Sequence, residues 1–178
     1  MNRYQDRWCR GVVVERGERP CGDRFAVIAD HLEPSRPQTA VDLGANLGYF
    51  SMRLADRFGM RVDAVESSHY RSLADAVTAN GDDRVLPVNT HVETVLRSDI
   101  YGPYDVVLAL SVLHHVDMPY DEALSRLRQL GETVIVELAT EPNACGQRQI
   151  AQQFIPDGAV MLGRFGSHLG GDRPLFVL

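Results

Sequence analysis

The sequence contains no lysine, and its 18 basic residues, all arginine, are outnumbered by 24 acidic residues. The resulting net charge of −6 argues against a broad nucleic-acid-binding surface, because such surfaces are strongly basic. The three cysteines, Cys9, Cys21 and Cys145, form no Cys-x-x-Cys pair, so neither a disulfide framework nor a zinc site is indicated. No apolar run is long enough to span a membrane and the N-terminus is polar, so we expect a soluble cytoplasmic protein.

The length of 178 residues and the 44% hydrophobic content fit one globular domain, without internal repeats. From residue 38 the pattern alternates between strands and helices, which predicts a mainly parallel sheet with helices on both faces. The predicted strands are 40–43, 61–66, 84–88, 105–110 and 133–138, followed by a terminal hairpin of 159–162 and 174–178 with a long Gly-rich loop. The predicted helices are 49–58, 68–79, 121–130 and 144–154.

Residues 1–37 precede this alternation, and we treat them as a lead-in or lid with one helix at 25–32. The first 24 residues are rich in arginine, which leaves two interpretations. They form either a solvated lead-in whose residues 11–14 pack on the domain, or a wall that supplies arginine and aromatic groups to a substrate. If they are exposed, they offer a contact for a homodimer. Residues 38–178 form the main domain.

A buried strand runs into a glycine turn and then a helix over residues 40–54. Gly44 and Gly48 have no Cβ, so a ligand can approach the backbone of this turn closely. Glu66 follows at the end of the second strand, 22 residues after Gly44, where a carboxylate can bind both hydroxyls of an adenosine ribose. The turn lacks the middle glycine of the dinucleotide-binding Gly-x-Gly-x-x-Gly pattern, which disfavours a dehydrogenase.

The acid-Leu-Gly turn at 42–48, the acid Glu66 and the apolar segment 104–116 together resemble the class I S-adenosylmethionine-dependent methyltransferases. The resemblance covers residues 38–178 and implies a Rossmann-like, doubly wound α/β fold. That fold has a seven-stranded, mostly parallel sheet with an antiparallel last strand. Asn46 stands where the family usually has its middle glycine.

The resemblance also implies which residues hold S-adenosylmethionine. The turn of Gly44, Ala45, Asn46 and Gly48 would pass close to the methionine part, with Asp42 ordering the turn. Glu66 would hold the ribose, and Asn89 would border the adenine. Leu110 and Ser111 would supply backbone contacts near the methionine amino group.

His114 and His115 follow the fourth strand, where a general base would help to deprotonate a hydroxyl acceptor. The alternative is that one of them only packs into the domain. Ser111, His114 and His115 also have the i, i+3, i+4 spacing of one helical face, so a divalent metal is a second hypothesis. Mg²⁺ would need oxygens from Glu137, Asp117 or the substrate as well, whereas a softer metal would accept both imidazoles, with His168 as a third ligand.

Residues 19–25 and 169–176 are similar to segments of small bacterial methyltransferases that act on saccharides. A sugar hydroxyl is therefore the expected methyl acceptor, with Glu137, Arg164 and His168 as candidate substrate contacts, the last two in a loop with Arg173. Two alternatives stay open. One is methylation of RNA, disfavoured by the charge, or of a non-sugar small molecule. The other is a non-catalytic subunit that binds S-adenosylmethionine for a partner.

Overall fold

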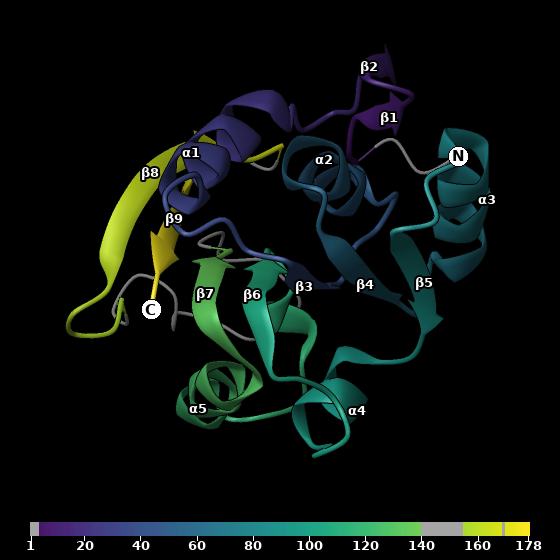
Figure 1. The fold of residues 1–178 in the computed structure, drawn as a ribbon. Helices are drawn as coiled ribbons and strands as arrows, with labels where there is room; N and C mark the ends of the chain where they lie inside the picture. The colour runs from purple at the N-terminus through teal and green to yellow at the C-terminus, as the bar shows by residue number, and fades with distance from the viewer. Residues whose placement is uncertain (1–3, 140–154, 169) are drawn as a thin grey trace.

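The computed structural model describes residues 4–139, 155–168 and 170–178, and a seven-stranded sheet lies at its centre (Figure 1). The strand order is β5-β4-β3-β6-β7-β9-β8. Strands β5 to β7 pair in parallel, while β9 is antiparallel to both of its neighbours. The strands are β3 (Thr39–Leu43), β4 (Arg61–Glu66), β5 (Val85–Asn89), β6 (Tyr104–Leu110), β7 (Gly131–Glu137), β8 (Val160–Gly166) and β9 (Asp172–Val177). The predicted α/β fold with an antiparallel last strand is confirmed.

Helices cover both faces of this sheet, as the alternating pattern predicted. Helices α1 (Gly22–Leu32), α2 (Tyr49–Phe58) and α3 (Tyr70–Asn80) lie on one face, and α4 (Val92–Leu96) and α5 (Tyr120–Leu130) lie on the other (Figure 1). Each face has its own buried apolar cluster, with Phe25 and Phe50 in one and Leu124 and Leu127 in the other. Burial of these side chains is the main driving force that holds the helices on the sheet.

The N-terminal segment forms an element that the sequence did not predict, a two-stranded hairpin of β1 (Arg7–Cys9) and β2 (Val12–Glu15). Because side chains alternate along a strand, Val13 packs against the core while Val12 and Val14 are 56% and 55% exposed. The expected packing of residues 11–14 is thus only partly seen. The Arg53 guanidinium lies 4.4 Å from the centre of the Trp8 ring, which joins this hairpin to α2.

The C-terminal hairpin is longer than predicted, and its loop is correspondingly shorter. Arg164 lies within β8 and Arg173 within β9, so the expectation that both sit in a flexible loop is wrong. The prediction took the glycines as signs of a loop, but Gly163 is accommodated inside β8 at a shift in strand register. The predicted helix 144–154 and Cys145 lie outside the described residues. No helix in the described part of the chain is long and apolar enough to span a membrane.

Candidate functional site

A cavity of about 590 Å³ lies at the carboxyl ends of β3, β4 and β6, the edge at which ligands bind in open parallel sheets. Its volume is in the range typical of small-molecule sites. The residues predicted from the sequence that line it are Gly44, Asn46, Glu66, Leu110, Ser111, His114, His115 and His168. Predicted residues from four separate parts of the chain therefore meet at one cavity.

The turn after β3 can form only because its residues adopt left-handed backbone conformations. Gly44 has a φ of 75° and Asn46 a φ of 57°. The amide groups of Gly44 and Ala45 both donate to the carbonyl oxygen of Val65 at 2.9 Å, which fixes the turn on β4. A Cβ on Gly44 would lie 2.6 Å from Val112 Cγ2, so glycine is required by packing as well as by conformation.

Two other residues predicted in this turn do not reach the cavity. Ala45 is fully buried in the apolar cluster. Gly48 has a φ of 76°, and a Cβ there would lie 2.7 Å from Leu73 Cδ1 on α3. In the structure, Gly48 therefore allows α2 and α3 to pack closely.

Glu66 lies at the end of β4 with its carboxylate oriented by two backbone amides. Oε2 accepts a hydrogen bond from the amide of Asn46 at 3.0 Å, and Oε1 accepts one from the amide of His69 at 3.1 Å. The residue is 9% exposed and lines the cavity. Each carboxylate oxygen can accept a further hydrogen bond, so the group is able to bind a pair of hydroxyls.

Asp42 lies behind the turn and does not line the cavity. Its carboxylate accepts a hydrogen bond from the hydroxyl of Ser51 at 2.6 Å, which ties β3 to α2. The residue is 2% exposed, and this burial raises the pKa of Asp42 to about 6, with the hydrogen bonds from Ser51 opposing the shift. The position fits the expected role of ordering the turn.

Asn89 ends β5 opposite Glu66 but is not among the residues that line the cavity. The wall beyond Glu66 is formed instead by Ser67, Ser68, His69, His91, Val92 and Glu93. Glu93 Oε1 accepts a hydrogen bond from the amide of Asp117 at 3.0 Å. The sequence did not single out Glu93, although an acid just after the third parallel strand is the signal that could have found it.

The segment after β6 places two histidines in the cavity wall. His114 and His115 belong to the short 3₁₀ helix η1 (Leu113–His115), and their ring centres are 3.9 Å apart. Partial burial lowers the pKa of His115 below its ordinary value of 6.5, and the positive charge of Arg173 lowers it further, with Glu66 opposing. His115 is therefore a neutral imidazole at pH 7, which can accept a proton.

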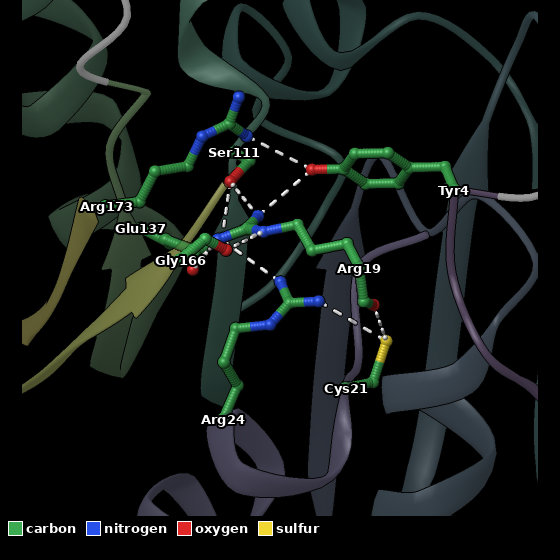
Figure 2. Close-up of polar contacts among 8 residues, drawn as sticks. All are labelled: Tyr4, Arg19, Cys21, Arg24, Ser111, Glu137, Gly166 and Arg173. Carbon is green, nitrogen blue, oxygen red and sulfur yellow. Dashed lines mark hydrogen bonds and ion pairs between the residues drawn. The ribbon is translucent and has the colours of Figure 1, made fainter. Parts of the chain in front are cut away.

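Glu137 is engaged in an ion-pair cluster that the sequence did not predict (Figure 2). Its carboxylate accepts hydrogen bonds from both terminal nitrogens of Arg19, from Arg24 at 3.1 Å, and from the hydroxyl of Ser111. Glu137 is 0% exposed, and the two arginines are at most 2% exposed. The sequence made Glu137 a substrate contact or metal ligand, but the structure places it behind the cavity wall.

The N-terminal segment reaches the cavity through this cluster. The Tyr4 hydroxyl accepts hydrogen bonds from Arg19 at 3.0 Å and from Arg173 at 3.1 Å, and both Tyr4 and Arg173 line the cavity (Figure 2). Gln5 also lines it and accepts a hydrogen bond from the amide of Leu47 at 3.3 Å. Tyr4 and Gln5 thus contribute to the cavity wall, whereas no arginine of residues 4–24 lines the cavity, so the prediction that this segment supplies arginine to a substrate stays untested.

The predicted metal ligands are not assembled. Within residues 4–139, 155–168 and 170–178, no group of three or more His, Cys, Asp or Glu side chains is arranged to hold a metal ion. Glu137 is paired with arginines, so it does not join His114 and His115 as a ligand. Arg164 is exposed on β8 and does not line the cavity, whereas His168 does and packs edge-on against Tyr4.

No family model matches the chain, but individual known proteins are similar to it. The chain is 28% identical to the O-antigen chain terminator bifunctional methyltransferase/kinase WbdD of Escherichia coli, over 90% of its own length. It spans only about a quarter of WbdD, because the match covers 25% of that protein.

The solved structures agree on the fold. A crystal structure of WbdD with a kinase inhibitor superposes with a TM-score of 0.79 at 26% identity, covering 91% of this chain and 41% of that one. Coclaurine N-methyltransferase bound to N-methylheliamine and S-adenosylhomocysteine matches at 16% identity with a TM-score of 0.56, covering 65% of this chain and 35% of that one. The chain therefore has the Rossmann-like fold of class I methyltransferases.

Proposed function

We propose that this protein transfers a methyl group from S-adenosylmethionine to a hydroxyl oxygen of a sugar or oligosaccharide. The observation that carries the proposal is that one cavity is lined by Gly44, the Glu66 carboxylate and the His114–His115 pair. The first two are suited to a nucleoside, and the histidines to a hydroxyl that must lose a proton. The homology to WbdD supports methyl transfer as the reaction class.

The residues of the cavity fit the cofactor. The remaining hydrogen-bonding capacity of Glu66 matches the two ribose hydroxyls, which are donors at adjacent carbons. Beyond Glu66, the wall of His69, His91 and Glu93 would border the adenine. At the other end, Leu110 and Ser111 line the cavity beside Gly44, where the methionine part would lie.

When bound, S-adenosylmethionine supplies an electrophilic methyl carbon, so the chain itself must align an oxygen nucleophile and remove its proton. We assign proton removal to His115, because its lowered pKa leaves Nδ1 or Nε2 free to accept at pH 7. His114 lies against the same ring and would orient it. Arg173 and Tyr4 line the same cavity, and we assign contacts with the acceptor to them.

The saccharide acceptor is inferred from the relative. WbdD is described as a terminator of O-antigen chains, and O-antigen is a polysaccharide. The quarter of WbdD that matches this chain corresponds to a methyltransferase fold here. We therefore infer methyl transfer for this chain, and not the kinase activity.

A transfer assay with labelled S-adenosylmethionine over a panel of mono- and oligosaccharides, with and without EDTA, tests the proposal. We expect label in a saccharide product, equal rates with EDTA, and loss of turnover in the double variant His114→Ala/His115→Ala. Label on RNA or on a non-sugar molecule alone would overturn the acceptor assignment. Undiminished turnover in the double variant would overturn the assignment of the base.

A further inference from the structure

Ser111 lines the cavity in a backbone conformation that a serine seldom adopts. Its φ is 56°, in the left-handed region that disfavours residues with a Cβ. Such a conformation persists only where the surroundings hold it. The neighbours Leu110 and Val112 line the cavity with it, so the conformation of Ser111 sets the direction in which the chain leaves β6.

Three hydrogen bonds hold this serine, and two of them join it to Glu137. The Ser111 amide donates to the carbonyl oxygen of Glu137 at 2.9 Å, and the hydroxyl donates to Oε2 of the same residue. The hydroxyl also accepts a hydrogen bond from Arg19 Nη1 at 2.8 Å. The backbone and the side chain of Ser111 are thus fixed to one buried carboxylate and one guanidinium.

The two arginines on Glu137 have different roles in this arrangement. Arg19 contacts both carboxylate oxygens as well as Ser111, whereas Arg24 contacts Oε2, the sulfur of Cys21 and the Phe50 ring. Both arginines help to neutralise a carboxylate that would be costly to bury alone. Only Arg19 links that carboxylate to the serine.

Arg19 is itself fixed by its own N-terminal segment and by strand β8. Its Nε donates to the carbonyl oxygen of Gly166 at 3.2 Å, its amide donates to the carbonyl oxygen of Tyr4 at 3.1 Å, and the side chain is 1% exposed. It does not line the cavity, so any effect on a ligand must pass through the residues that it holds.

We infer that Arg19 is a positioning residue, which keeps Ser111 in its left-handed conformation against Glu137 and so shapes the 110–115 wall of the cavity for the cofactor. The inference rests on the proposal that the cavity binds S-adenosylmethionine. The N-terminal segment would thus contribute to cofactor binding through a residue, Arg19, that does not itself line the cavity.

The test compares Arg19→Lys with Arg24→Lys, because lysine keeps the charge but loses the planar fork. Calorimetry with S-adenosylhomocysteine should show an affinity about tenfold weaker in Arg19→Lys, which is about 1.4 kcal/mol, and little change in Arg24→Lys. Without any ligand, hydrogen exchange at the Ser111 amide should accelerate in Arg19→Lys and stay near the wild-type rate in Arg24→Lys. Equal effects of the two variants would overturn the inference.

A double-mutant cycle with Ser111→Gly separates positioning from loss of stability. Glycine adopts a positive φ without strain, so Arg19→Lys should weaken binding much less in the Ser111→Gly background than in the wild type. The same loss in both backgrounds would contradict the inference. If the wild type fails to bind S-adenosylhomocysteine, the proposed function is wrong, while the exchange rate of the Ser111 amide still decides the role of Arg19.

Discussion

His115 is the side chain to which the chemistry of the cavity is assigned, and its ionisation is set by what surrounds it. Partial burial and the charge of Arg173 both disfavour the imidazolium, so the pKa of His115 lies below 6.5. Only the neutral form can accept a proton. The fraction of active enzyme should therefore rise with pH through this lowered pKa and stay constant above it.

We predict that kcat/KM for methyl transfer falls on the acid side of pH 6.5 and is flat from pH 7 to 8. The variant Arg173→Gln, which removes the positive charge beside His115, should move this acid limb to higher pH. A pH–rate profile of the two proteins measures both effects. An acid limb above pH 7 in the wild type, or one that Arg173→Gln leaves in place, would count against His115 as the base.

Gly44 offers a second test, because the chain contains a matched control. Gly44 and Gly81 have φ values of 75° and 74°, but an added Cβ meets Val112 at 2.6 Å at Gly44 and nothing within 4 Å at Gly81. Gly81→Ala should lower the free energy of unfolding by about 1–2 kcal/mol, the cost of the left-handed conformation.

Gly44→Ala should cost clearly more, because the Val112 side chain must also move, and it should weaken binding of S-adenosylhomocysteine at the same cavity wall. Chemical denaturation and calorimetry on the two variants provide the measurements. Equal losses of stability, with ligand affinity intact in both, would show that Gly44 is only a turn residue.

Residues that belong to a recognisable local sequence pattern were predictable from the sequence. Residues whose partner lies far away in the sequence were not. Gly44 and Glu66 stand at fixed places relative to predicted strands, and both line the cavity as expected. Arg19 and Glu137 are 118 residues apart, and nothing near either residue reveals the partner. Glu137 was noticed only because it ends a strand, so its role was misassigned.

Strand β3 and helix α2 are joined by the hydrogen bond from Ser51 to Asp42, and the burial of the Asp42 carboxyl makes the stability of the fold depend on pH. Folding raises the pKa of Asp42 from 3.8 to about 6, so the folded state binds the proton more tightly than the unfolded state. The stabilisation is complete below pH 3.8 and is lost as the pH rises through about 6. At pH 7 the ionised, buried carboxylate of Asp42 therefore destabilises the folded state.

Asp42→Asn removes this charge and keeps an oxygen that can accept from Ser51. Relative to wild type, the variant should therefore gain up to about 3 kcal/mol between pH 4 and pH 7, the value of the pKa difference. The exposed Asp30→Asn is the control and should show no such gain. Denaturation curves at the two pH values compare the variants, and a relative stability of Asp42→Asn that does not change with pH would contradict the account.

The central strands β6 and β7 were predictable because each contains a run of buried, mainly apolar residues, as in β6, where four consecutive residues are buried. Pro87 lies in β5, which is the outermost strand, where a missing backbone N–H costs little. The β1–β2 hairpin and the full length of β8 were missed. None of their residues is fully buried, and the three consecutive valines of β2 show no alternation of apolar and polar residues, which is the signal of a half-buried strand.

In the molecule as a whole, the sheet and its helices could be predicted from the sequence. The contribution of the N-terminal segment to the cavity wall is seen only in the three-dimensional structure. The ends of β3, β4 and β6 meet at one cavity, which Tyr4 and Gln5 of the N-terminal segment also line, and the buried Arg19 joins Tyr4 to Glu137 (Figure 2). Since the chain spans a quarter of WbdD, the shared fold concerns this part of that protein alone.

The central claim is that this cavity binds S-adenosylmethionine through Glu66. Calorimetric titration of the wild type and of Glu66→Gln with S-adenosylhomocysteine, with NAD as the control ligand, tests it most directly. We predict one binding site in the wild type, an affinity about 10- to 100-fold weaker in Glu66→Gln because two charge-assisted hydrogen bonds are lost, and no heat with NAD. A folded wild-type protein that does not bind S-adenosylhomocysteine, or a Glu66→Gln variant that binds it equally well, would contradict the claim.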